Sequence, residues 1–580
     1  MRVFLDLKWF FLQEKKSYIT GILILLMVAF LQLIPPKVVG IVVDGIKDST
    51  LTRADIVRWM LILAGTAVAM YGLRYVWRIM IFGSANRLSK LLRNQLYHHF
   101  TKMAPSFFQK RRVGDLMAHA TNDLQAIQQT AGSGVLTLVD SLSTGGFVMI
   151  AMAFTISWKL TLIALIPMPF MAILTSYYGT LLHKRFHKAQ EAFSSLNDKT
   201  QESVTGVKVL KTFGQEKEDI ESFRRESEDV VQKNMSVAKV DSLFDPTISI
   251  IVGLSFFLSI VFGSKFVLSG ELSIGELISF TTYLGLLIWP MLAFGWLFNI
   301  VERGRASYDR VSRLLREEVE IVDGTVMEQP KGNIEYAIES FAFPGEKDPA
   351  LKGIQFTLEK GQTLGIVGKT GAGKTSLLKL LLREFEGYSG EVRFDGIPIT
   401  QYALGSLRQS IGYVPQDHFL FSATIKENIA FTDPLASMEK VKGAAESAQI
   451  HHDIEGFPQG YDTVVGERGV SLSGGQKQRI SIARALLMEP ELLILDDSLS
   501  AVDAKTEEAI LTSLRKEREG KTTIITSHRL SAIVHADLIL VMDGGRVTQR
   551  GTHEELMQED GWYKEMYLRQ QLEDIVEYGG

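Results

Sequence analysis

The chain contains no cysteine. Disulfide bonds, thiolate metal sites and thiol catalysis are therefore excluded, and the composition fits a reducing compartment. The formal net charge is only −4 over 580 residues, which gives no indication of a nucleic-acid partner or of a strongly charged protein partner. A chain of this length exceeds the size of a single hydrophobic core, so at least two domains are expected.

Long apolar runs are present, and they cluster before about residue 305. A helix needs about 20 apolar residues to cross the hydrocarbon core of a bilayer. Six segments approach this length, which favours six membrane-spanning helices over buried helices of a soluble core. The first lacks the small residues of a signal cleavage site and is interpreted as a retained span. The predicted spans are Ser17–Pro36, a less apolar one from Trp59 onward, Val135–Trp158, Leu160–Leu182, Thr247–Ser264 and Leu277–Val301.

The distribution of basic residues predicts the orientation of these spans. Lys8, Lys15 and Lys16 precede the first span, and Arg303 and Arg305 follow the sixth. The connections after the first, third and fifth spans are short and carry few net positive charges. Because Lys and Arg near span ends stay in the cytoplasm, both termini are predicted to be cytoplasmic.

Two long segments, after the second and fourth spans, have helical spacing and few helix breakers. They are predicted to continue the membrane helices into the cytoplasm. Each has a candidate bend, one at Pro105–Asp115 and one at Val204–Val207. Either these bends contact a cytoplasmic domain or they are plain surface loops.

The second half of the chain alternates strand and helix patterns, and its most specific motif is a glycine-rich loop. Gly368-Lys369-Thr370-Gly371-Ala372-Gly373-Lys374-Thr375 follows the strand-like Thr363–Val367 and opens a predicted helix at Ser376–Leu382. This is a Walker A loop in its strand–loop–helix context. Its backbone N–H groups and the helix N-terminus are suited to phosphates. Lys374 is predicted to reach the β- and γ-phosphates of ATP, and the Thr375 hydroxyl to ligate Mg²⁺.

Two further motifs accompany this loop. Leu492–Asp496 is an apolar strand that ends in a carboxylate, which is typical of Walker B and predicts that Asp496 completes the Mg²⁺ site. Between the Walker motifs lies Leu472-Ser473-Gly474-Gly475-Gln476, followed by a helical pattern over Lys477–Leu487. This segment resembles the signature sequence of the ATP-binding cassette (ABC) family. Six spans followed by one cassette are similar to its exporter branch over essentially the whole chain.

The resemblance implies roles for other residues. Ser473, Gly474, Gly475 and Gln476 would close over the nucleotide of a partner cassette, so the ATPase would be an obligate pair. Gln416 matches the glutamine that contacts Mg²⁺ and the attacking water, and His528 matches the histidine that contacts the γ-phosphate. Phe343 stands where the family usually has a Tyr stacked on adenine, with core packing as the alternative. Two more segments match loops of the family, namely Ser500–Asp503, the D-loop, and Gly466–Gly469, which resembles the loop that senses the membrane domain.

One position departs from the family pattern. Active cassettes usually have Glu after the Walker B Asp as general base for the attacking water, and this chain has Asp497. Asp is one methylene shorter, and a displacement of about 1 Å costs on the order of a hundredfold in rate. We predict that the site built on Lys374 and Asp497, with Gln416 and His528 as its other catalytic residues, turns over slowly. The alternative is that a backbone adjustment lets Asp497 work normally.

A slow site combined with an intact signature motif predicts a partner. A second half-transporter with Glu after its Walker B Asp would receive Ser473–Gln476 of this chain and hydrolyse ATP. This asymmetry resembles the heterodimeric multidrug exporters of Gram-positive bacteria. Asp496–Asp503 and Val414–His418 look like one half of such pairs.

The function implied by this resemblance is ATP-driven efflux of hydrophobic drugs or other lipophilic compounds across the bacterial plasma membrane. A lipid or peptide exporter has the same architecture, and a non-transporting regulator that uses ATP binding as a switch is compatible with Asp497. A soluble cassette acting on DNA or ribosomes is excluded by the spans. Substrate contact, lipid contact and helix packing all remain open for the aromatic and Met side chains Phe147, Met149, Met152, Trp289, Met291, Phe294, Trp296 and Phe298. Asp140 either interacts with a cationic drug or lies at the membrane edge, where a carboxylate costs little.

The expected fold is therefore an α-helical membrane domain joined to an α/β P-loop ATPase domain with a helical subdomain. We place the six-helix transmembrane domain and its cytoplasmic helical extensions at residues 1–315. A linker follows at 316–332, the nucleotide-binding domain at 333–571 and a C-terminal tail at 572–580.

Overall fold

The computed structural model describes residues 2–466 and 470–578, without the side chains of Ala172, Phe294 and residues 574–578. Glu467, Arg468 and Gly469 of the predicted membrane-sensing loop, and the Phe294 side chain, thus lie outside the described residues. The chain forms two compact units. The membrane unit comprises residues 1–99 and 114–317, and the cassette unit comprises residues 100–113 and 318–580.

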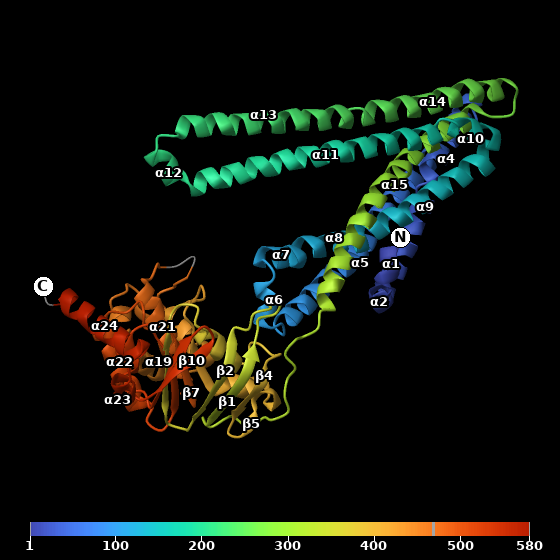
Figure 1. Cartoon of the computed structure of the whole chain (residues 1–580). Coiled ribbons are helices and arrows are strands. Elements are labelled where there is room, and N and C mark those ends of the chain that lie inside the picture. Colours follow the sequence, from blue (N-terminus) through green and yellow to red (C-terminus); the bar gives the residue numbers. More distant parts are fainter. Residues whose placement is uncertain (1, 467–469, 579–580) are drawn as a thin grey trace. The chain divides into compact units, whose positions relative to one another are not determined.

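The membrane unit is helical throughout its described residues (Figure 1). Its α-helices are α1 (Arg2–Asp6), α2 (Lys8–Gln13), α3 (Lys15–Leu31), α4 (Ile34–Lys47), α5 (Arg53–Phe100), α7 (Val113–Ala118), α8 (Leu124–Gln129), α9 (Val135–Ile150), α10 (Trp158–Leu165), α11 (Met168–Thr205), α12 (Val207–Thr212), α13 (Glu216–Asp241), α14 (Phe244–Leu268) and α15 (Ile274–Leu315). Three π-helical segments, η1 (His119–Asp123), η2 (Thr130–Gly134) and η3 (Ala151–Ser157), lie between α7 and α10.

Within the described residues, five helical stretches are long and apolar enough to cross a membrane: Lys15–Lys47, Arg53–Phe100, Val113–Leu165, Glu216–Leu268 and Ile274–Leu315. They contain five of the six predicted spans. The remaining span, predicted at Leu160–Leu182, is divided between α10 and α11 at Ile166-Pro167, where proline supplies no N–H to the helical hydrogen bonds. The first span also differs from its prediction. Pro35 and Pro36 occupy the first turn of α4, a position that proline tolerates, so the helical stretch continues to Lys47.

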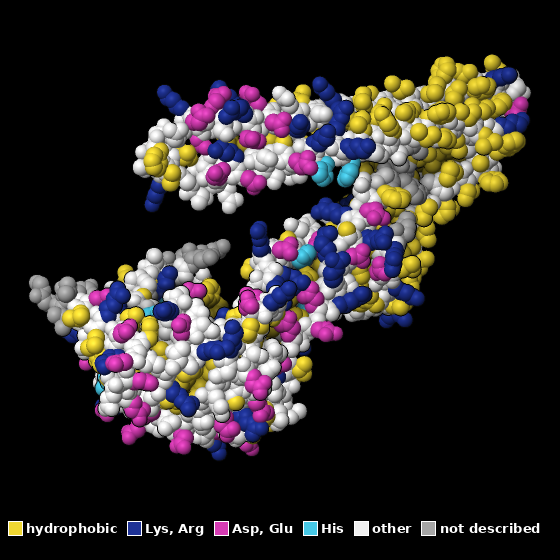
Figure 2. Space-filling view, viewed as in Figure 1, with side chains coloured by type: hydrophobic (Ala, Val, Ile, Leu, Met, Phe, Trp, Pro, Cys, Tyr) yellow, Lys and Arg dark blue, Asp and Glu magenta, His cyan; other side chains and the backbone are white. Residues whose placement is uncertain are grey.

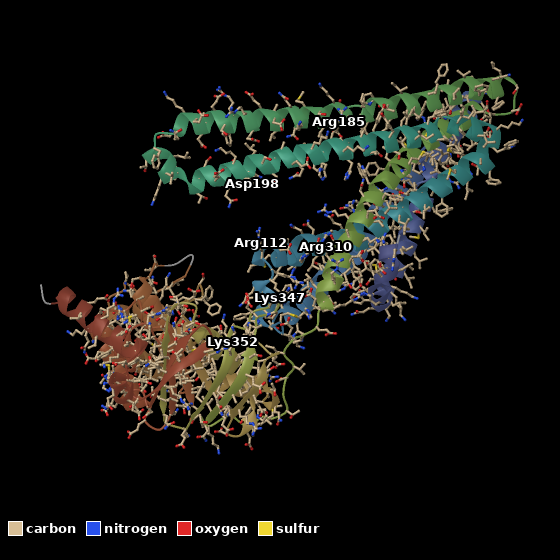
Figure 3. The ribbon with its side chains drawn as sticks, in the orientation of Figure 1. Arg112, Arg185, Asp198, Arg310, Lys347 and Lys352 are labelled. Carbon is tan, nitrogen blue, oxygen red and sulfur yellow. The ribbon has the colours of Figure 1, made fainter. Side chains whose placement is uncertain are left out.

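Two of the helices continue well past their apolar parts. Figure 1 shows α11 and α13 side by side, connected by the short α12. The Arg185 guanidinium of α11 donates a 2.9 Å hydrogen bond to the Ser236 carbonyl of α13 (Figure 3). Charged side chains of both signs cover this pair, whereas hydrophobic side chains cover the opposite end around α10 and α14 (Figure 2). The bend predicted at Val204–Val207 is confirmed, because α11 ends at Thr205 and α12 begins at Val207.

The other predicted bend forms α6 (Pro105–Gln109), which groups with the cassette unit. The Ser106 hydroxyl donates to the Glu320 carboxylate in the segment that enters the cassette, and the Lys110 amine lies 4.0 Å from the same carboxylate. The bend thus contacts the predicted linker at Glu320, and its contact with the cytoplasmic domain stays a prediction.

The aromatic and Met side chains suggested as substrate contacts differ in burial, and Phe147 and Met291 among them are half-buried. Met152 is fully buried and packs in the helical core, so core packing applies to it. Met149, Trp289, Trp296 and Phe298 are exposed in the single chain, and the two Trp rings meet edge to face at 5.3 Å. Asp140 is half-buried and accepts a 3.2 Å hydrogen bond from the Thr144 hydroxyl.

Helices α4 and α15 pack unusually closely through two glycines. A Cβ atom at Gly275 would lie 2.0 Å from the Gly40 carbonyl oxygen, so only glycine fits there. Small residues at helix interfaces allow such approach in membrane proteins. The Asp44 carboxylate fixes the same contact, accepting hydrogen bonds from the Gly275 N–H at 2.7 Å and from the Ser273 hydroxyl at 2.5 Å. Ser273 also caps the N-terminus of α15.

Replacing Gly275 with alanine is expected to destabilise the membrane unit by about 1–3 kcal/mol, since the added methyl group meets backbone that cannot rotate away. The midpoint of thermal unfolding of the detergent-solubilised protein measures the effect. Gly65→Ala is the matched control, because a Cβ at Gly65 meets no atom within 4 Å. Equal midpoints for the two variants would contradict the packing argument.

The cassette unit contains two sheets. The antiparallel one has the order β2-β1-β4-β5 and the other, mostly parallel, the order β10-β9-β3-β8-β7-β6. The strands are β1 (Ile334–Phe341), β2 (Leu351–Leu358), β3 (Thr363–Gly368), β4 (Ser389–Phe394), β5 (Ile397–Pro398), β6 (Ile411–Val414), β7 (Leu492–Asp496), β8 (Thr522–Thr526), β9 (Leu538–Asp543) and β10 (Arg546–Gly551). Every residue of β7 and β8 is buried, as expected of parallel strands covered on both faces.

Helices pack around these sheets. They are α16 (Lys374–Leu381), α17 (Leu404–Gln409), α18 (Ile425–Ile429), α19 (Met438–Ser447), α20 (His451–Glu455), α21 (Gly474–Leu487), α22 (Ala504–Glu517), α23 (His553–Gln558) and α24 (Trp562–Tyr578), with short 3₁₀ turns η4 (Ile399–Gln401), η5 (Ala430–Thr432), η6 (Gly460–Asp462) and η7 (Leu530–Ile533). Helices α18 to α21 lie between β6 and β7 in the sequence and correspond to the expected helical subdomain. Residues 572–578 of the predicted tail belong to α24. The domain boundaries stay a prediction.

Candidate nucleotide-binding site

The sheet topology brings the ends of four strands to one edge. Strands β3, β8, β7 and β6 are adjacent and parallel, so their carboxyl ends point the same way. The Walker A loop follows β3, Asp496 ends β7, His528 follows β8 and Gln416 follows β6. Ligands of open α/β sheets bind at this carboxyl edge. Segments more than 100 residues apart in sequence therefore meet where a nucleotide phosphate is expected.

The Walker A loop has the predicted strand–loop–helix structure, which is confirmed by β3 and α16. Gly368 has φ 151° and approaches β9 so closely that a Cβ would lie 2.1 Å from the Met542 carbonyl oxygen. The Lys374 ammonium is buried and donates to the carbonyls of Gly368, at 2.8 Å, and Lys369, at 3.3 Å. Burial lowers the pKa of Lys374, and the carboxylates of Asp497 and Asp496 oppose that shift.

Asp496 is buried and held by three hydroxyl groups. The Thr526 hydroxyl donates to one carboxylate oxygen at 2.7 Å, the Thr375 hydroxyl lies 3.2 Å from that same oxygen, and the Tyr413 hydroxyl lies 3.3 Å from the other. A Thr hydroxyl beside a carboxylate is the protein donor set that Mg²⁺ uses when phosphates supply its other ligands. The described residues contain no cluster of three or more His, Cys, Asp or Glu that would hold a metal by itself.

Tyr413 and Thr526 are functional candidates that sequence reasoning missed. Tyr413 lies in β6 and Thr526 ends β8, on either side of β7. Only their register against β7, which pairs Thr526 with Asp496, shows that they reach the carboxylate. The negative charge of Asp496 and burial together raise the pKa of Tyr413 well above its ordinary value, so this hydroxyl stays protonated and can donate.

Asp497 has a left-handed backbone with φ 46°, a conformation that Asp adopts more readily than most residues. Its N–H donates to the Thr526 carbonyl and hydroxyl, both at 3.0 Å, while its half-buried carboxylate has no hydrogen bond recorded to the described residues. The imidazole of His418 lies in the electrostatic field of this carboxylate. Burial lowers the pKa of His418 against the opposing charges of Asp417 and Asp497, and its buried Nδ1 is unpaired in the described structure.

The remaining predicted residues are more loosely held. Phe343 is half-buried, and its ring meets Phe341 and Phe385 edge to face at 5.1 and 5.3 Å. Both alternatives for Phe343, stacking on adenine and packing in the core, are compatible with this position. The side chains of Gln416 and His528 are exposed at the sheet edge.

The signature residues form a separate feature. Ser473 caps α21 in a reciprocal capping box with Gln476, and the Gln476 amide donates to Asp453. No hydrogen bond links Ser473–Gln476 to the Walker A loop within the described ranges. The segment is instead joined to the D-loop. The Gln478 side chain accepts the Ala501 N–H at 3.1 Å, and a Cβ at Gly475 would lie 2.9 Å from the Ala501 carbonyl oxygen.

Comparison with known proteins agrees with this architecture. Residues 18–291 match the model of the ABC transporter transmembrane region, and residues 351–500 match the ABC transporter model. The Multidrug resistance-like ATP-binding protein MdlA of Escherichia coli (strain K12) is 49% identical over 578 residues, which cover 100% of this chain and 98% of MdlA. This chain belongs to the ABC transporter family.

Two further comparisons agree with this assignment. The Probable multidrug resistance ABC transporter ATP-binding/permease protein YheI of Bacillus subtilis (strain 168) is 48% identical over 99% of this chain and 98% of YheI. A solved bacterial Atm1-family ABC exporter with ATP bound superposes with a TM-score of 0.79 at 26% identity, over 96% of this chain and 99% of that structure. The chain therefore has the ABC exporter fold, a helical membrane domain followed by an ATP-binding cassette.

Proposed function

We propose that this chain is the slow-site half of a heterodimeric ABC exporter that moves hydrophobic drugs or other lipophilic compounds out of the cell. Asp497 carries the proposal for the slow site. It stands directly after Asp496, where a general base belongs, and its carboxylate is one methylene shorter than that of Glu. The printed names of the relatives MdlA and YheI, which refer to multidrug resistance, support the substrate class.

In this proposal the chain's own residues bind ATP and Mg²⁺. The backbone N–H groups of Gly368–Thr375 and the Lys374 ammonium hold the phosphates, while Phe343 covers the adenine. Thr375 and Asp496 hold Mg²⁺, which neutralises phosphate charge when bound, and Gln416 approaches it from β6. His528 contacts the γ-phosphate, and Asp497 orients water poorly because its carboxylate is withdrawn.

The signature motif serves the other nucleotide of the pair. Its residues Ser473–Gln476 form a capped, exposed helix N-terminus, which suits an incoming phosphate. Gln476 is bonded to Asp453, and Gln478 of the same helix is bonded to the D-loop, whereas no hydrogen bond joins Ser473–Gln476 to the Walker A loop within the described residues. A partner half-transporter with Glu after its Walker B Asp would therefore supply the fast site. Lys and Arg at the span ends support a cytoplasmic position for both termini.

The decisive experiment compares ATPase activity and dye efflux in membrane vesicles that contain this chain, a half-transporter of the same organism with Glu after its Walker B Asp, or both. We expect the pair to hydrolyse ATP and export a lipophilic dye, and this chain alone to do neither at a comparable rate. Robust ATPase and efflux by this chain alone would show an active homodimer and overturn the heterodimer. ATPase by the pair with no efflux of any lipophilic dye would favour a lipid or peptide exporter, and nucleotide binding without transport would favour a regulator.

A further inference from the structure

The C-terminal helix α24 is bonded to the loop that carries His528. The side-chain amide of Gln570 donates to the His528 carbonyl at 2.8 Å, and its carbonyl oxygen accepts the Leu530 N–H at 2.9 Å. One amide thus brackets the loop on both sides of Arg529. Two simultaneous hydrogen bonds from one planar group restrict both the position and the orientation of the backbone they hold.

The start of α24 is fixed by contacts with β10 and α23. Tyr563 is fully buried, and its hydroxyl pairs with the His553 imidazole at 2.8 Å. Its ring stacks at 6.4 Å on that of Tyr567, and its N–H donates to the Gln549 side chain. Gln570 lies seven residues after Tyr563, two helical turns along the same face. Gln570 therefore lies on a helix whose first turns are held in place.

Other bonds hold the loop on either side of His528: the Ser527 N–H donates to the Ile366 carbonyl at 3.3 Å, and the Arg529 N–H donates to the Ser527 hydroxyl at 2.9 Å. The Arg529 side chain donates to the Val502 carbonyl of the D-loop and to the Glu507 carboxylate. Between α22, the loop and α24 lies a cavity of about 950 Å³, lined by Arg529, Tyr567 and Gln570 among others. Leu530 and Ile533 fix the C-terminal side of the loop by packing in the core, and the two bonds of Gln570 add a polar restraint on the side that faces this cavity.

We infer that Gln570 is a positioning residue for γ-phosphate recognition, acting through the backbone of the His528 loop. The inference rests on the proposed role of His528 at the nucleotide site. The His528 side chain is exposed and depends on its backbone for its direction. Releasing the His528 carbonyl and the Leu530 N–H lets the imidazole move relative to the phosphates, while the Walker A loop that binds the β-phosphate is unchanged.

The test compares binding of AMP-PNP, a non-hydrolysable ATP analogue, with binding of ADP to the full-length chain in nanodiscs with Mg²⁺. The wild-type chain and Gln570→Ala are expected to bind ADP equally. AMP-PNP affinity should fall about threefold to tenfold in the variant, the loss expected for one or two net hydrogen bonds. A variant that merely weakened the fold would lose affinity for both nucleotides in parallel.

Two matched variants sharpen the result. Gln570→Glu keeps the shape and the acceptor for Leu530 but places an anionic oxygen opposite the His528 carbonyl, so it should behave like Gln570→Ala. Gln571→Ala removes only a bond within α24, to the Tyr567 hydroxyl, and should leave both affinities unchanged. His528→Ala separates the two proposals. If His528→Ala lowers AMP-PNP affinity and Gln570→Ala does not, the positioning role is wrong. If His528→Ala changes nothing, the proposed role of His528 itself fails.

Discussion

Replacing Asp497 with glutamate is expected to raise the ATPase rate of the purified chain by on the order of a hundredfold. The longer side chain returns the carboxylate by about 1 Å toward the attacking water, and a displacement of that size accounts for a rate change of this order. The left-handed backbone at position 497 suits Asp better than Glu, so backbone strain in the Glu variant reduces the gain in ATPase rate. Phosphate release from the detergent-solubilised protein at saturating ATP measures the rate.

The control for this prediction is Asp497→Asn, which keeps the length and removes the charge. The Asn variant should be no faster than the wild-type chain, because an amide cannot accept the proton of the attacking water. A wild-type rate already equal to that of Asp497→Glu would contradict the slow-site proposal and show that Asp497 acts as a normal general base. The separate hydrogen bonds of the Asp497 N–H to Thr526 are available to all three variants.

Gly474→Asp is expected to reduce the ATPase rate of the mixed pair by on the order of a hundredfold, although every residue of the partner's own Walker motifs is intact. Gly474 is the first residue of α21, and an added Cβ would lie 3.7 Å from the Ala501 Cβ, an ordinary contact. A carboxylate in the first turn of a helix interacts favourably with the helix dipole, so Gly474→Asp should preserve the fold. The new charge repels the partner's nucleotide phosphate and removes the electrostatic stabilisation offered there.

The comparison variant is Lys374→Ala in the same chain. It removes the buried ammonium from this chain's own phosphate loop, and in the mixed pair its effect should be much smaller than that of Gly474→Asp. Gly474→Ala controls for the added Cβ. Equal losses from Lys374→Ala and Gly474→Asp would mean that both sites contribute alike, as in a symmetric dimer, and would remove the basis for assigning the fast site to the partner.

Motifs with local structure could be predicted from the sequence. The apolar run before Gly368 and the helical pattern after it predict the phosphate loop, because strand, loop and helix are all encoded within a few residues. Proline effects were less predictable. Pro36 is predicted to end a span, but it occupies the first turn of α4. Pro167, in contrast, divides a predicted span between two helices. Only the surrounding packing distinguishes these two outcomes.

Contacts between distant segments could not be predicted. The bonds of Tyr413 and Thr526 to Asp496 depend on strand order, and the bonds of Gln570 to the His528 loop depend on where α24 docks. Tyr, Thr and Gln are common residue types whose positions carry no local signal. A strand order of β8-β7-β6, which brings these side chains together, follows from tertiary packing rather than from any one of the segments.

The contact between Gly475 and Ala501 has a consequence for timing. The Ala501 carbonyl leaves no room for even a methyl group on Gly475, and Gln478 holds the Ala501 N–H from the same helix. The D-loop, which begins three residues after Asp497, and the start of the signature helix are thus joined into one piece. A nucleotide retained for many turnovers beside Asp497 would hold that piece in one place. In the proposed heterodimer, the presence of that nucleotide would then limit the rate at which the partner subunit opens and closes.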